Sequence, residues 1–327
     1  MIGADCFGVT LRLESEDPDF EAFVARNYRP FAAQPAAQPD VRVRFGPAAG
    51  GRARQAKCGM AALGMGLHFD SDSLYWENEF GFAVEVTPTR DEGFEVEAYH
   101  FDLERETDPD LRARNHQRAM RWALHFPLFR LLAARRGMAL VHASALARDG
   151  RALVFCGLNK VGKSTLAAYL ARQPGYRFMT DNFLLADGTA VYGFPETLRL
   201  APGSLDRLGI DGEAGRTVYG KHHIEIGPEE TCLEADPAAF FLVSNGATLA
   251  AAPLPAARAL ETLSGLHSYL GEFPEQSYLS GLPLLPGVAT AQPNGKASVL
   301  ADRPWFRLSL PLDWALADVK ELVESCI

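Results

Sequence analysis

The sequence predicts an α/β protein with a β-rich N-terminal region, and three patterns along its 327 residues support this prediction. Residues 1–105 alternate apolar and polar side chains with period two, as half-buried strands do. Residues 108–136 change to the 3.6-residue period of a helix. Apolar runs typical of buried strands and Ala- or Leu-rich helical segments then follow one another to the end of the chain. We therefore divide the chain into an accessory region (1–105), a connecting helix (106–137) and an α/β domain (138–327).

The N-terminal region contains three short stretches in which every second residue is apolar, at residues 9–13, 41–45 and 94–98. This alternation is typical of an antiparallel sheet with one buried face. No cluster of acidic, His and Ser residues in this region resembles a catalytic site. We therefore expect an accessory domain that packs against a partner or recognises it.

The helical segment begins at Asp108-Pro109, a common start signal, and Pro127 should kink the helix or divide it in two. Four arginines recur along it, namely Arg112, Arg114, Arg118 and Arg121. They can be interpreted as a phosphate-binding cluster or as a solvated helix face. Because charge on a helix usually marks its solvated side, we favour the second interpretation.

The most specific pattern of the chain lies in residues 151–173. An apolar run predicts a strand, an Ala-rich segment predicts a helix, and between them lies a loop of the form G-x-x-x-x-G-K-S-T. The loop consists of Gly157, Leu158, Asn159, Lys160, Val161, Gly162, Lys163, Ser164 and Thr165. In this context the glycines let backbone N–H groups converge on an anion at the positive end of the new helix. The loop therefore predicts a bound nucleoside triphosphate, with Lys163 on its β- and γ-phosphates and the Ser164 hydroxyl on Mg²⁺.

A β-hairpin is expected directly before this loop. The apolar run 138–147 is followed by Asp149-Gly150, a turn that joins two antiparallel strands. His142 would then lie on the strand paired with the one that leads into the loop, where it can approach a γ-phosphate. A histidine in an apolar strand is equally well explained as a core residue, so both interpretations stay open.

Candidate site residues follow the loop helix along the chain. Asp181 comes directly after a short apolar strand, where phosphoryl-transfer enzymes of this kind place a Mg²⁺ partner or a general base. Glu196 is a candidate second metal carboxylate, and Arg199 is a candidate phosphate or substrate contact. A surface ion pair between Glu196 and Arg199 would explain these two residues equally well.

Residues 216–226 alternate again and carry Lys221, His222 and His223. Adjacent residues of a strand point to opposite faces, so the two histidines do not form a two-His metal clamp. We expect Lys221 or one of the histidines near the site, with Lys221 as a candidate substrate contact.

The remaining segments complete the α/β pattern. Strands are expected at 240–243 and 305–310, and helices at 249–270 and 313–326. The segment 271–287 is rich in Gly, Pro and Ser and is expected to be a mobile cover over the site.

Composition excludes several function classes. The net charge of −9 argues against general binding of nucleic acid or acidic membranes, because affinity for phosphate backbones needs a basic surface. The five cysteines show no C-x-x-C spacing, so neither a disulfide scaffold nor a zinc site is expected. The first residues have no cationic start followed by an apolar block, so we expect no secretory leader, and no run approaches the ~20 apolar residues of a membrane span. We expect a cytoplasmic protein with no nucleic-acid or membrane partner.

Small GTPases have a similar loop and must be considered. They also require a D-x-x-G motif after a strand and an N-K-x-D motif that recognises guanine. The segment from Asp206 to Gly209 fits the first motif by spacing only, and no N-K-x-D occurs in the chain. The sequence therefore argues against a GTPase.

Residues 138–200 resemble the HPr kinase/phosphorylase family and its smaller kinase relatives. That family has a histidine on the strand before the loop, the loop itself, and an Asp-Asp pair at the end of the next strand. His142, the loop described above and Asp181-Asn182 occupy these positions here. The resemblance implies a fold like the P-loop nucleotide domain of phosphoenolpyruvate carboxykinase, with ATP as phosphoryl donor and Mg²⁺ as cofactor.

The chain departs from this family at two places. Asn182 replaces the second acid, so either Asp181 alone does the work of the base or one metal contact is weaker. The family's glycine-rich segment linked to phosphorolysis has no counterpart around residues 196–200, so phosphorylase activity is not expected and HPr is not implied as a substrate. Shortened relatives include kinases that phosphorylate a serine of a ribosomally made peptide, such as a lasso-peptide precursor.

We therefore expect an ATP-dependent kinase that transfers the γ-phosphoryl group to a hydroxyl, in particular to a serine of a peptide or protein recognised by the β-rich region. Lys163 and the loop amides would neutralise the transferred group, Asp181 would accept the hydroxyl proton, and His142 would orient Asp181. The Mg²⁺ ligands would be Ser164, Asp181 and Glu196.

Two alternatives stay open at the level of sequence. The first is a kinase that acts on a small hydroxy metabolite, because it would need the same loop and acid. The second is a regulatory protein that binds ATP without turnover, which Asn182 keeps open. The sequence does not fix the oligomeric state, and a homo-oligomer is compatible with it.

Overall fold

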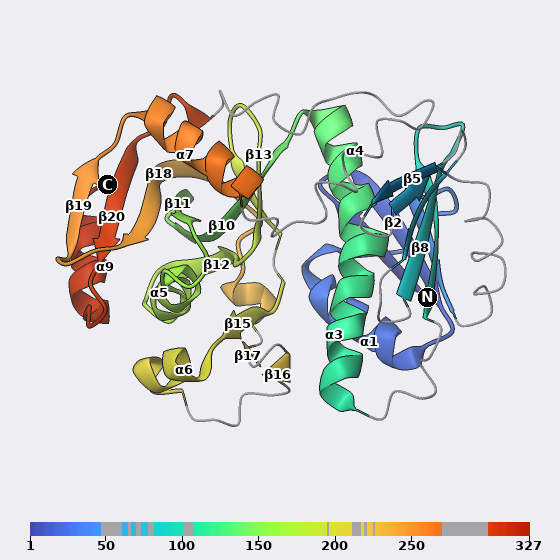
Figure 1. Ribbon diagram of the computed structural model, residues 1–327, viewed down its shortest axis with the longest axis horizontal. Helices are drawn as coiled ribbons and strands as arrows, with labels where there is room; N and C mark the ends of the chain where they lie inside the picture. Colours follow the sequence, from blue (N-terminus) through green and yellow to red (C-terminus); the bar gives the residue numbers. More distant parts are fainter. Residues whose placement is uncertain are drawn as a thin grey trace. The chain divides into compact units, whose positions relative to one another are not determined.

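The described residues of the computed structural model are 1–46, 61–64, 67–69, 73–77, 82–100, 108–194, 196–210, 217–218, 221–224, 226–269 and 300–327. They form a mixed α/β protein with several sheets (Figure 1). The described chain divides between Arg136 and Gly137 into two compact units. The segment 271–287, which we expected to be a cover, lies outside the described residues.

A mixed sheet forms the first unit, with the strand order β3-β1-β2-β4-β9-β8-β7-β6-β5. Its strands are β1 (Ile2–Cys6), β2 (Val9–Ser15), β3 (Ala32–Ala33), β4 (Val41–Phe45), β5 (Ala61–Gly64), β6 (Leu67–Phe69), β7 (Leu74–Glu77), β8 (Phe82–Pro88) and β9 (Phe94–His100). The expectation of an antiparallel sheet is wrong at its centre, because β2 pairs with β4, and β4 with β9, in parallel. Alternating apolar and polar residues indicate that one face of a strand is buried, but they do not indicate whether the neighbouring strand is parallel or antiparallel.

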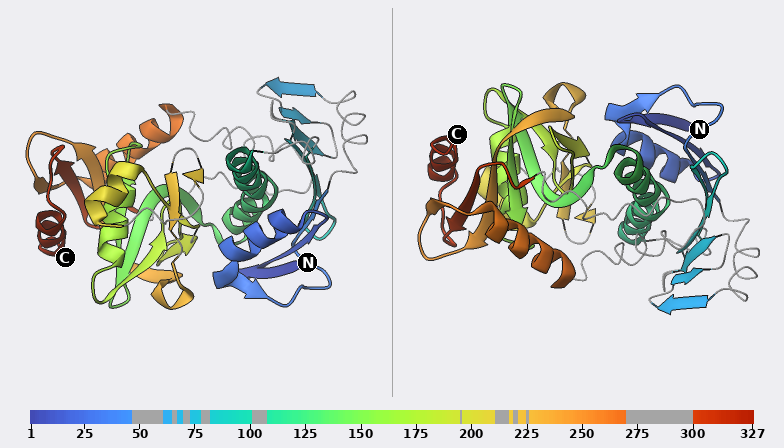
Figure 2. Two further views of the ribbon diagram at one scale, coloured as in Figure 1. Left: turned by 90° about the horizontal axis from the view of Figure 1, so that it is seen from below. Right: turned by 90° about the horizontal axis from the view of Figure 1, so that it is seen from above.

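Helices cover one face of this sheet, as both views in Figure 2 show. They are α1 (Pro18–Asn27), the short η1 (Arg29–Phe31), α3 (Pro109–Met120), the π-helix η4 (Arg121–His125) and α4 (Phe126–Arg136). The face beneath them is apolar, with Leu11, Val43 and Val96 each at most 1% exposed. The segment that we treated as a connecting helix thus packs on the sheet of the first unit.

The predicted break at Pro127 coincides with a change of helix type. The backbone N–H of Phe126 donates to the carbonyl of Arg121, which is the i to i−5 pattern of a π-helix. Pro127 has no N–H and cannot continue the α-helical hydrogen bonds of the preceding turn. Within η4, the Trp122 ring stacks on Trp76 of β7, with centroids 3.7 Å apart and planes inclined by 5°. The helix therefore continues from α3 through η4 into α4 without a gap, and Pro127 follows a π-helical turn whose Trp122 lies on the sheet.

Two sheets share the long strands β10 (Ala139–Arg148) and β18 (Glu234–Asn245) in the second unit. The first sheet has the order β12-β10-β11-β18-β20-β19, and the second has the order β10-β13-β14-β18. The other strands are β11 (Arg151–Gly157), β12 (Tyr176–Thr180), β13 (Phe183–Ala186), β14 (Val191–Phe194), β19 (Ala250–Pro253) and β20 (Trp305–Leu310). The three strands β11, β18 and β20 run parallel. The predicted hairpin joins β10 to β11, with positive φ angles of 52° at Asp149 and 76° at Gly150.

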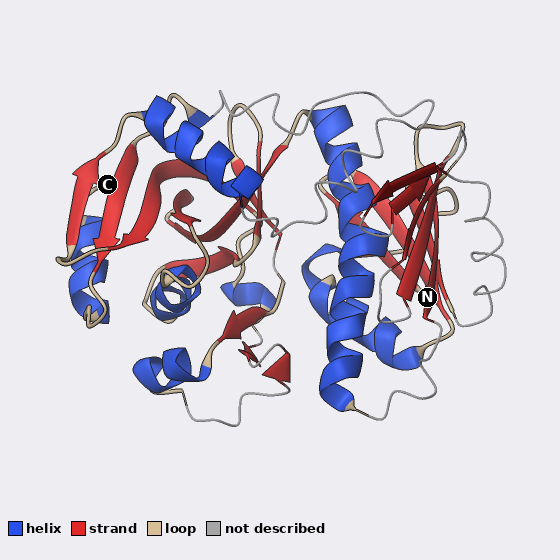
Figure 3. Cartoon of the chain, in the orientation of Figure 1, coloured by secondary structure: helices blue, strands red, loops and turns tan. Residues whose placement is uncertain are grey.

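The helices of this unit are α5 (Lys163–Ala171), α6 (Pro202–Leu208), the short η5 (Pro228–Glu230), α7 (Ala256–Tyr269) and α9 (Leu316–Glu324). A small separate sheet has the order β15 (Leu198–Leu200), β17 (Lys221–Ile224) and β16 (Thr217–Val218) (Figure 3). Residues 250–253, which we expected at the start of a helix, instead form β19 and pair antiparallel with β20. No helix in the described part of the chain is long and apolar enough to cross a membrane.

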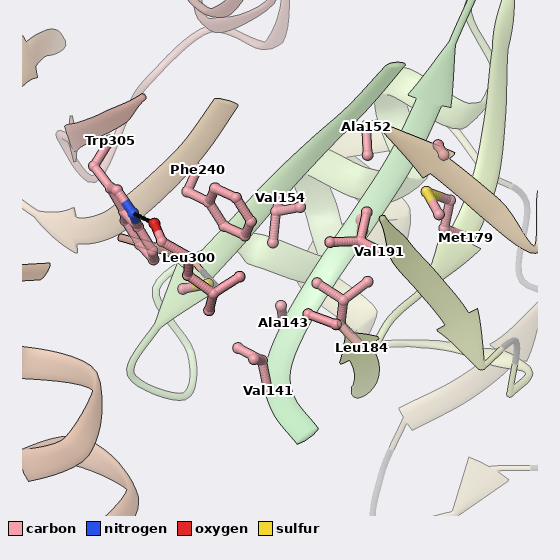
Figure 4. Packing of buried hydrophobic residues seen from close by; sticks show 14 of the residues in the cluster. Val141, Ala143, Ala152, Val154, Met179, Leu184, Val191, Phe240, Leu300 and Trp305 are labelled. Carbon is pink, nitrogen blue, oxygen red and sulfur yellow. Dashed lines mark hydrogen bonds between the residues drawn. The ribbon is translucent and has the colours of Figure 1, made fainter. Parts of the chain in front are cut away.

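Buried apolar side chains hold these layers together. One cluster fills the space between the two sheets and includes Val141, Val154, Leu184 and Phe240 (Figure 4). A second cluster packs α5 and α9 on the other face of the first sheet, with Phe155, Leu166 and Val319 each fully buried. The strand β11 therefore contributes to both cores and carries the loop that follows it on a rigid support.

Candidate functional site

The loop from Gly157 to Thr165 joins β11 to α5 in a conformation that requires glycine. The φ angle is 134° at Gly157 and 102° at Gly162, both in the region that side-chain-bearing residues rarely adopt. A Cβ atom on Gly157 would lie 2.4 Å from the carbonyl oxygen of Val243 on β18. Gly162 occupies the position immediately before α5 begins at Lys163. The first glycine is therefore needed where the packed strand β11 ends, and the second is needed where the helix α5 begins.

Lys163 turns its side chain back over the loop that precedes it. Its ammonium nitrogen donates to the carbonyl oxygens of Gly157 and Leu158, at 2.8 and 2.7 Å. The residue is only 5% exposed, so the positive charge lies within the loop and not in bulk solvent. Such a charge, together with the amino end of α5, creates a favourable position for an anion.

Asp181 lies directly after β12, between a serine of β10 and a serine of the loop. The Ser144 hydroxyl donates to Oδ1 of Asp181 at 2.6 Å, and the Ser164 hydroxyl lies near enough to lower the pKa of this carboxyl. The structure thus brings together the loop residue Ser164 and the acid Asp181, which the sequence analysis assigned to one site. The role of Ser144 was missed, because one serine in an Ala- and Leu-rich strand carries no signal in the sequence.

Burial and nearby positive charges act on the pKa of Asp181 in opposite directions. Asp181 is 4% exposed, and this burial raises the pKa of its carboxyl above the ordinary value of 3.8. The hydrogen bond from Ser144, the nearby Ser164 hydroxyl and the charges of Arg199 and Lys221 lower the same pKa in part. Arg199 and Lys221, which we expected near phosphate or substrate, therefore lie within electrostatic reach of Asp181.

A threonine fixes the turn that presents Asp181 and Asn182. The Thr180 hydroxyl is fully buried and lies 2.9 Å from the carbonyl oxygens of both Phe183 and Phe194. It also accepts a hydrogen bond from the backbone N–H of Asn182, at 3.4 Å. The position of Asp181 is thus set by its own side-chain contacts and by the backbone of the turn.

Asn182, Glu196 and Arg199 form a connected polar group beside this turn. The Asn182 amide donates to Oε2 of Glu196 at 3.0 Å, and the Arg199 guanidinium lies 3.5 Å from the same oxygen. Glu196 is 4% exposed, so its pair with Arg199 is buried and is not the surface ion pair that we considered. An amide at position 182 can donate this hydrogen bond, whereas a carboxylate would repel Glu196.

The small sheet places its charged residues on one face. Arg199 stands opposite His223 in the antiparallel pair of β15 and β17, and Lys221 shares their face because it is two residues from His223. The ring nitrogen Nδ1 of His223 lies 3.1 Å from the Thr197 hydroxyl. His222 stands opposite Leu200 instead, on the face where Leu198 and Leu200 are buried. The two histidines therefore lie on opposite faces, as the alternation predicts.

His142 lies on β10 directly opposite Phe183 and is half-buried. Because side chains two residues apart on a strand share a face, His142 is on the same face of β10 as Ser144. The hydrogen bond from this strand to Asp181 comes from Ser144. The loop residue Thr165 is tied to a neighbouring helix, since its hydroxyl lies 2.8 Å from that of Ser204 in α6.

The donor set at this site fits a magnesium ion that is shared with phosphate oxygens. Mg²⁺ commonly takes one or two carboxylates, with phosphates and waters completing its octahedron. The Ser164 hydroxyl lies near the Asp181 carboxylate, and Glu196 is joined to the same turn through Asn182. Within the described ranges, no three or more His, Cys, Asp or Glu side chains gather into a metal-binding group. A serine hydroxyl and one or two carboxylates are ligand types that Mg²⁺ takes together with phosphate oxygens.

Comparisons with known proteins find similarity to solved structures. No protein-family model matches the chain, and no curated protein matches it. Among solved structures, the HPr(Ser) kinase/phosphatase from Coxiella burnetii aligns with a TM-score of 0.29 and 10% sequence identity. The alignment covers 57% of this chain and 94% of that chain. A TM-score this low does not establish a shared fold.

Proposed function

We propose that this chain is a cytoplasmic phosphotransferase that moves the γ-phosphoryl group of ATP to a hydroxyl, in particular to a serine of a peptide or protein. The observation that carries the proposal is the convergence of the loop residues Lys163 and Ser164 with the buried acid Asp181. Ser164 lies near enough to Asp181 to lower the pKa of its carboxyl, while Lys163 is held within the same loop. A phosphate cradle next to a carboxylate is what hydroxyl phosphorylation needs.

The chemical step requires little from the protein beyond charge and position. The acceptor oxygen forms a bond to the γ-phosphorus, the bond to the β–γ bridging oxygen breaks, and ADP leaves. Lys163 and the backbone N–H groups of the loop lower the energy of the charge on the transferred group. Arg199 and Lys221 lie within electrostatic reach of Asp181 and add further positive charge.

Asp181 accepts the proton that the acceptor hydroxyl loses. Its raised pKa favours this role, because a carboxylate in a buried site is a stronger base than one in water. The hydrogen bond from Ser144 to Oδ1 holds the carboxyl group in one orientation. His142, which shares a face of β10 with Ser144, supports the same region of the site.

Mg²⁺, when bound with the nucleotide, would neutralise phosphate charge and orient the phosphate chain. Ser164, Asp181 and Glu196 would hold it. Asn182 keeps Glu196 in place through its amide hydrogen bond, which an ionised aspartate at this position could not donate. The fold that this function implies is a P-loop core like that of phosphoenolpyruvate carboxykinase.

The test is transfer of label from γ-labelled ATP with Mg²⁺, using peptides and proteins on one side and hydroxy metabolites on the other as acceptors. The proposal predicts label on a serine of a peptide or protein. Label on free metabolites alone would make the chain a small-molecule kinase. Tight ATP binding with no labelled product from any acceptor would contradict a phosphotransferase and favour a nucleotide sensor.

A further inference from the structure

Two leucines beside the phosphate loop are exposed to solvent. Leu158 is 43% exposed and Leu312 is 91% exposed. The other large apolar side chains with high exposure in the described ranges are Met1 and Ile327, the first and last residues. Single exposed leucines are ordinary on protein surfaces, but two on adjoining loops concentrate apolar area at one place.

Both leucines lie at the same edge of the first sheet of the second unit. The strands β11, β18 and β20 run parallel, so the segments that follow them leave from a common edge. Leu158 follows β11 by one residue, and Leu312 follows β20 by two. The registers align Gly157 with Val243 and Val243 with Leu308, which sets the ends of the three strands side by side. Ligands of α/β proteins bind outside such carboxyl ends.

The turn that carries Leu312 packs directly on the phosphate loop. A Cβ atom on Gly162 would lie 3.3 Å from the Trp314 ring and 3.5 Å from the side chain of Leu310. Leu310 and Trp314 are buried, at 1% and 7% exposure, so they anchor the turn on both sides of Leu312. The Trp314 N–H also donates to the carbonyl of Pro311, at 3.3 Å. Leu312 is therefore held outward by a fixed backbone next to the loop.

We propose that Leu158 and Leu312 form an apolar surface that receives the purine base of the bound nucleoside triphosphate. This inference rests on the proposed function, since the phosphates must occupy the loop for the base to reach this edge. The base has flat apolar faces, and covering a leucine with one removes apolar area from water. The strands β11 and β20 lie on either side of β18, two strand spacings or roughly 10 Å apart. A bicyclic purine spans more of this distance than a single-ring pyrimidine.

The test is calorimetric titration of the full chain with three ligands in the presence of Mg²⁺: ATP, CTP and inorganic tripolyphosphate. The wild-type chain should bind ATP more tightly than the other two. Leu312→Ser should raise the Kd of ATP about five- to tenfold and leave the Kd of tripolyphosphate within about twofold. Ile327→Ser is the matched control, because it removes an exposed apolar side chain at the other end of α9.

The outcomes separate this inference from the proposed function. If tripolyphosphate binds but Leu312→Ser leaves the affinity for ATP unchanged, the base lies elsewhere. The inference about the two leucines is then wrong, while the proposed function is not contradicted. An equal loss for ATP and tripolyphosphate would mean that the substitution disturbs the loop, which also overturns it. If the wild-type chain binds neither ligand, the proposed function fails together with the inference. A thermal melt confirms folding, and Leu312 at 91% exposure contributes no core contact that the change could remove.

Discussion

Asp17 joins two helices of the first unit, and its charge should be worth a measurable part of that unit's stability. The residue precedes α1 and is 7% exposed. Its Oδ1 accepts from the backbone N–H groups of Asp19 and Phe20, at 2.9 and 3.2 Å. Its Oδ2 lies 3.0 Å from Nε2 of His116 in α3, and Arg112 lies 3.5 Å from Oδ1. One carboxylate therefore caps α1 and binds α3.

The size and sign of the effect follow from the pKa of Asp17. Burial acts to raise this pKa, but the hydrogen bond and charge of His116 and the two backbone N–H groups outweigh it and lower the pKa from 3.8 to about 2. A shift of this size corresponds to about 2 kcal/mol of folding free energy. Because the pKa is lowered in the folded state, this stability is present above pH 3.8 and is lost as the pH falls towards 2.

Asp17→Asn isolates the charge, since asparagine keeps an oxygen that can accept the two backbone hydrogen bonds. We expect the variant to be about 2 kcal/mol less stable than the wild type near pH 7. The difference should fall to about half near pH 3 and nearly vanish at pH 2 and below. The measurement is urea unfolding followed by near-UV circular dichroism, because the stacked Trp76 and Trp122 rings report the first unit.

Asp19→Asn is the matched control for this experiment. Asp19 is also in the first turn of α1 and pairs with Arg112 at 3.1 Å, but its side chain is 66% exposed. We expect its loss to change stability by less than about 0.5 kcal/mol, as for other exposed pairs. Equal effects of the two variants near pH 7, or an Asp17→Asn effect that does not depend on pH, would refute the reasoning.

Three further predictions concern the candidate site. Ser144→Ala removes the hydrogen bond to Oδ1 of Asp181, so it should lower the kcat of phosphoryl transfer about tenfold and leave the Kd of ATP unchanged. Steady-state kinetics measures kcat and calorimetry measures Kd. Equal changes in kcat and in Kd would show that Ser144 has only a structural role. Thr180→Val removes the one hydroxyl proton that can be donated to the carbonyl of Phe183 or of Phe194, and it should cost about 1–3 kcal/mol in urea unfolding. A cost near zero would show that the hydroxyl does not fix the turn. Gly157→Ala places a Cβ atom 2.4 Å from the Val243 carbonyl oxygen, so it should abolish ATP binding and lower Tm. Gly150→Ala is the control, because Gly150 also has a positive φ angle but no atom within 4 Å of the added Cβ, and it should only lower Tm modestly. Similar losses of ATP binding in both variants would contradict the packing argument.

The local elements around the site could be predicted because their signals are short-range. The hairpin, the loop and the helix after it are encoded by contiguous residues, and positive φ angles occur at Asp149, Gly150, Gly157 and Gly162. Pro127 likewise acts on its own helix, through the hydrogen bond that it cannot donate. These effects need no knowledge of distant partners.

What could not be predicted depends on contacts between residues far apart in the sequence. Ser144 meets Asp181 because β10 and β12 are paired, and a single strand serine gives no hint of this. The burial of the pair between Glu196 and Arg199 depends on the small sheet around it, so a surface pair was equally plausible from sequence. The direction of β4 relative to its neighbours is set by the crossings of the chain, which alternation does not record.

The proposed role of Asp181 is that of the base in a phosphoryl transfer on the loop from Gly157 to Thr165. It is tested most directly by comparing wild type and Asp181→Asn in two assays, calorimetric binding of ATP with Mg²⁺ and transfer of label from γ-labelled ATP to the acceptor. We expect Asp181→Asn to bind ATP within about threefold of wild type and to transfer label at least ~100-fold more slowly. Transfer by Asp181→Asn at the wild-type rate would contradict the claim.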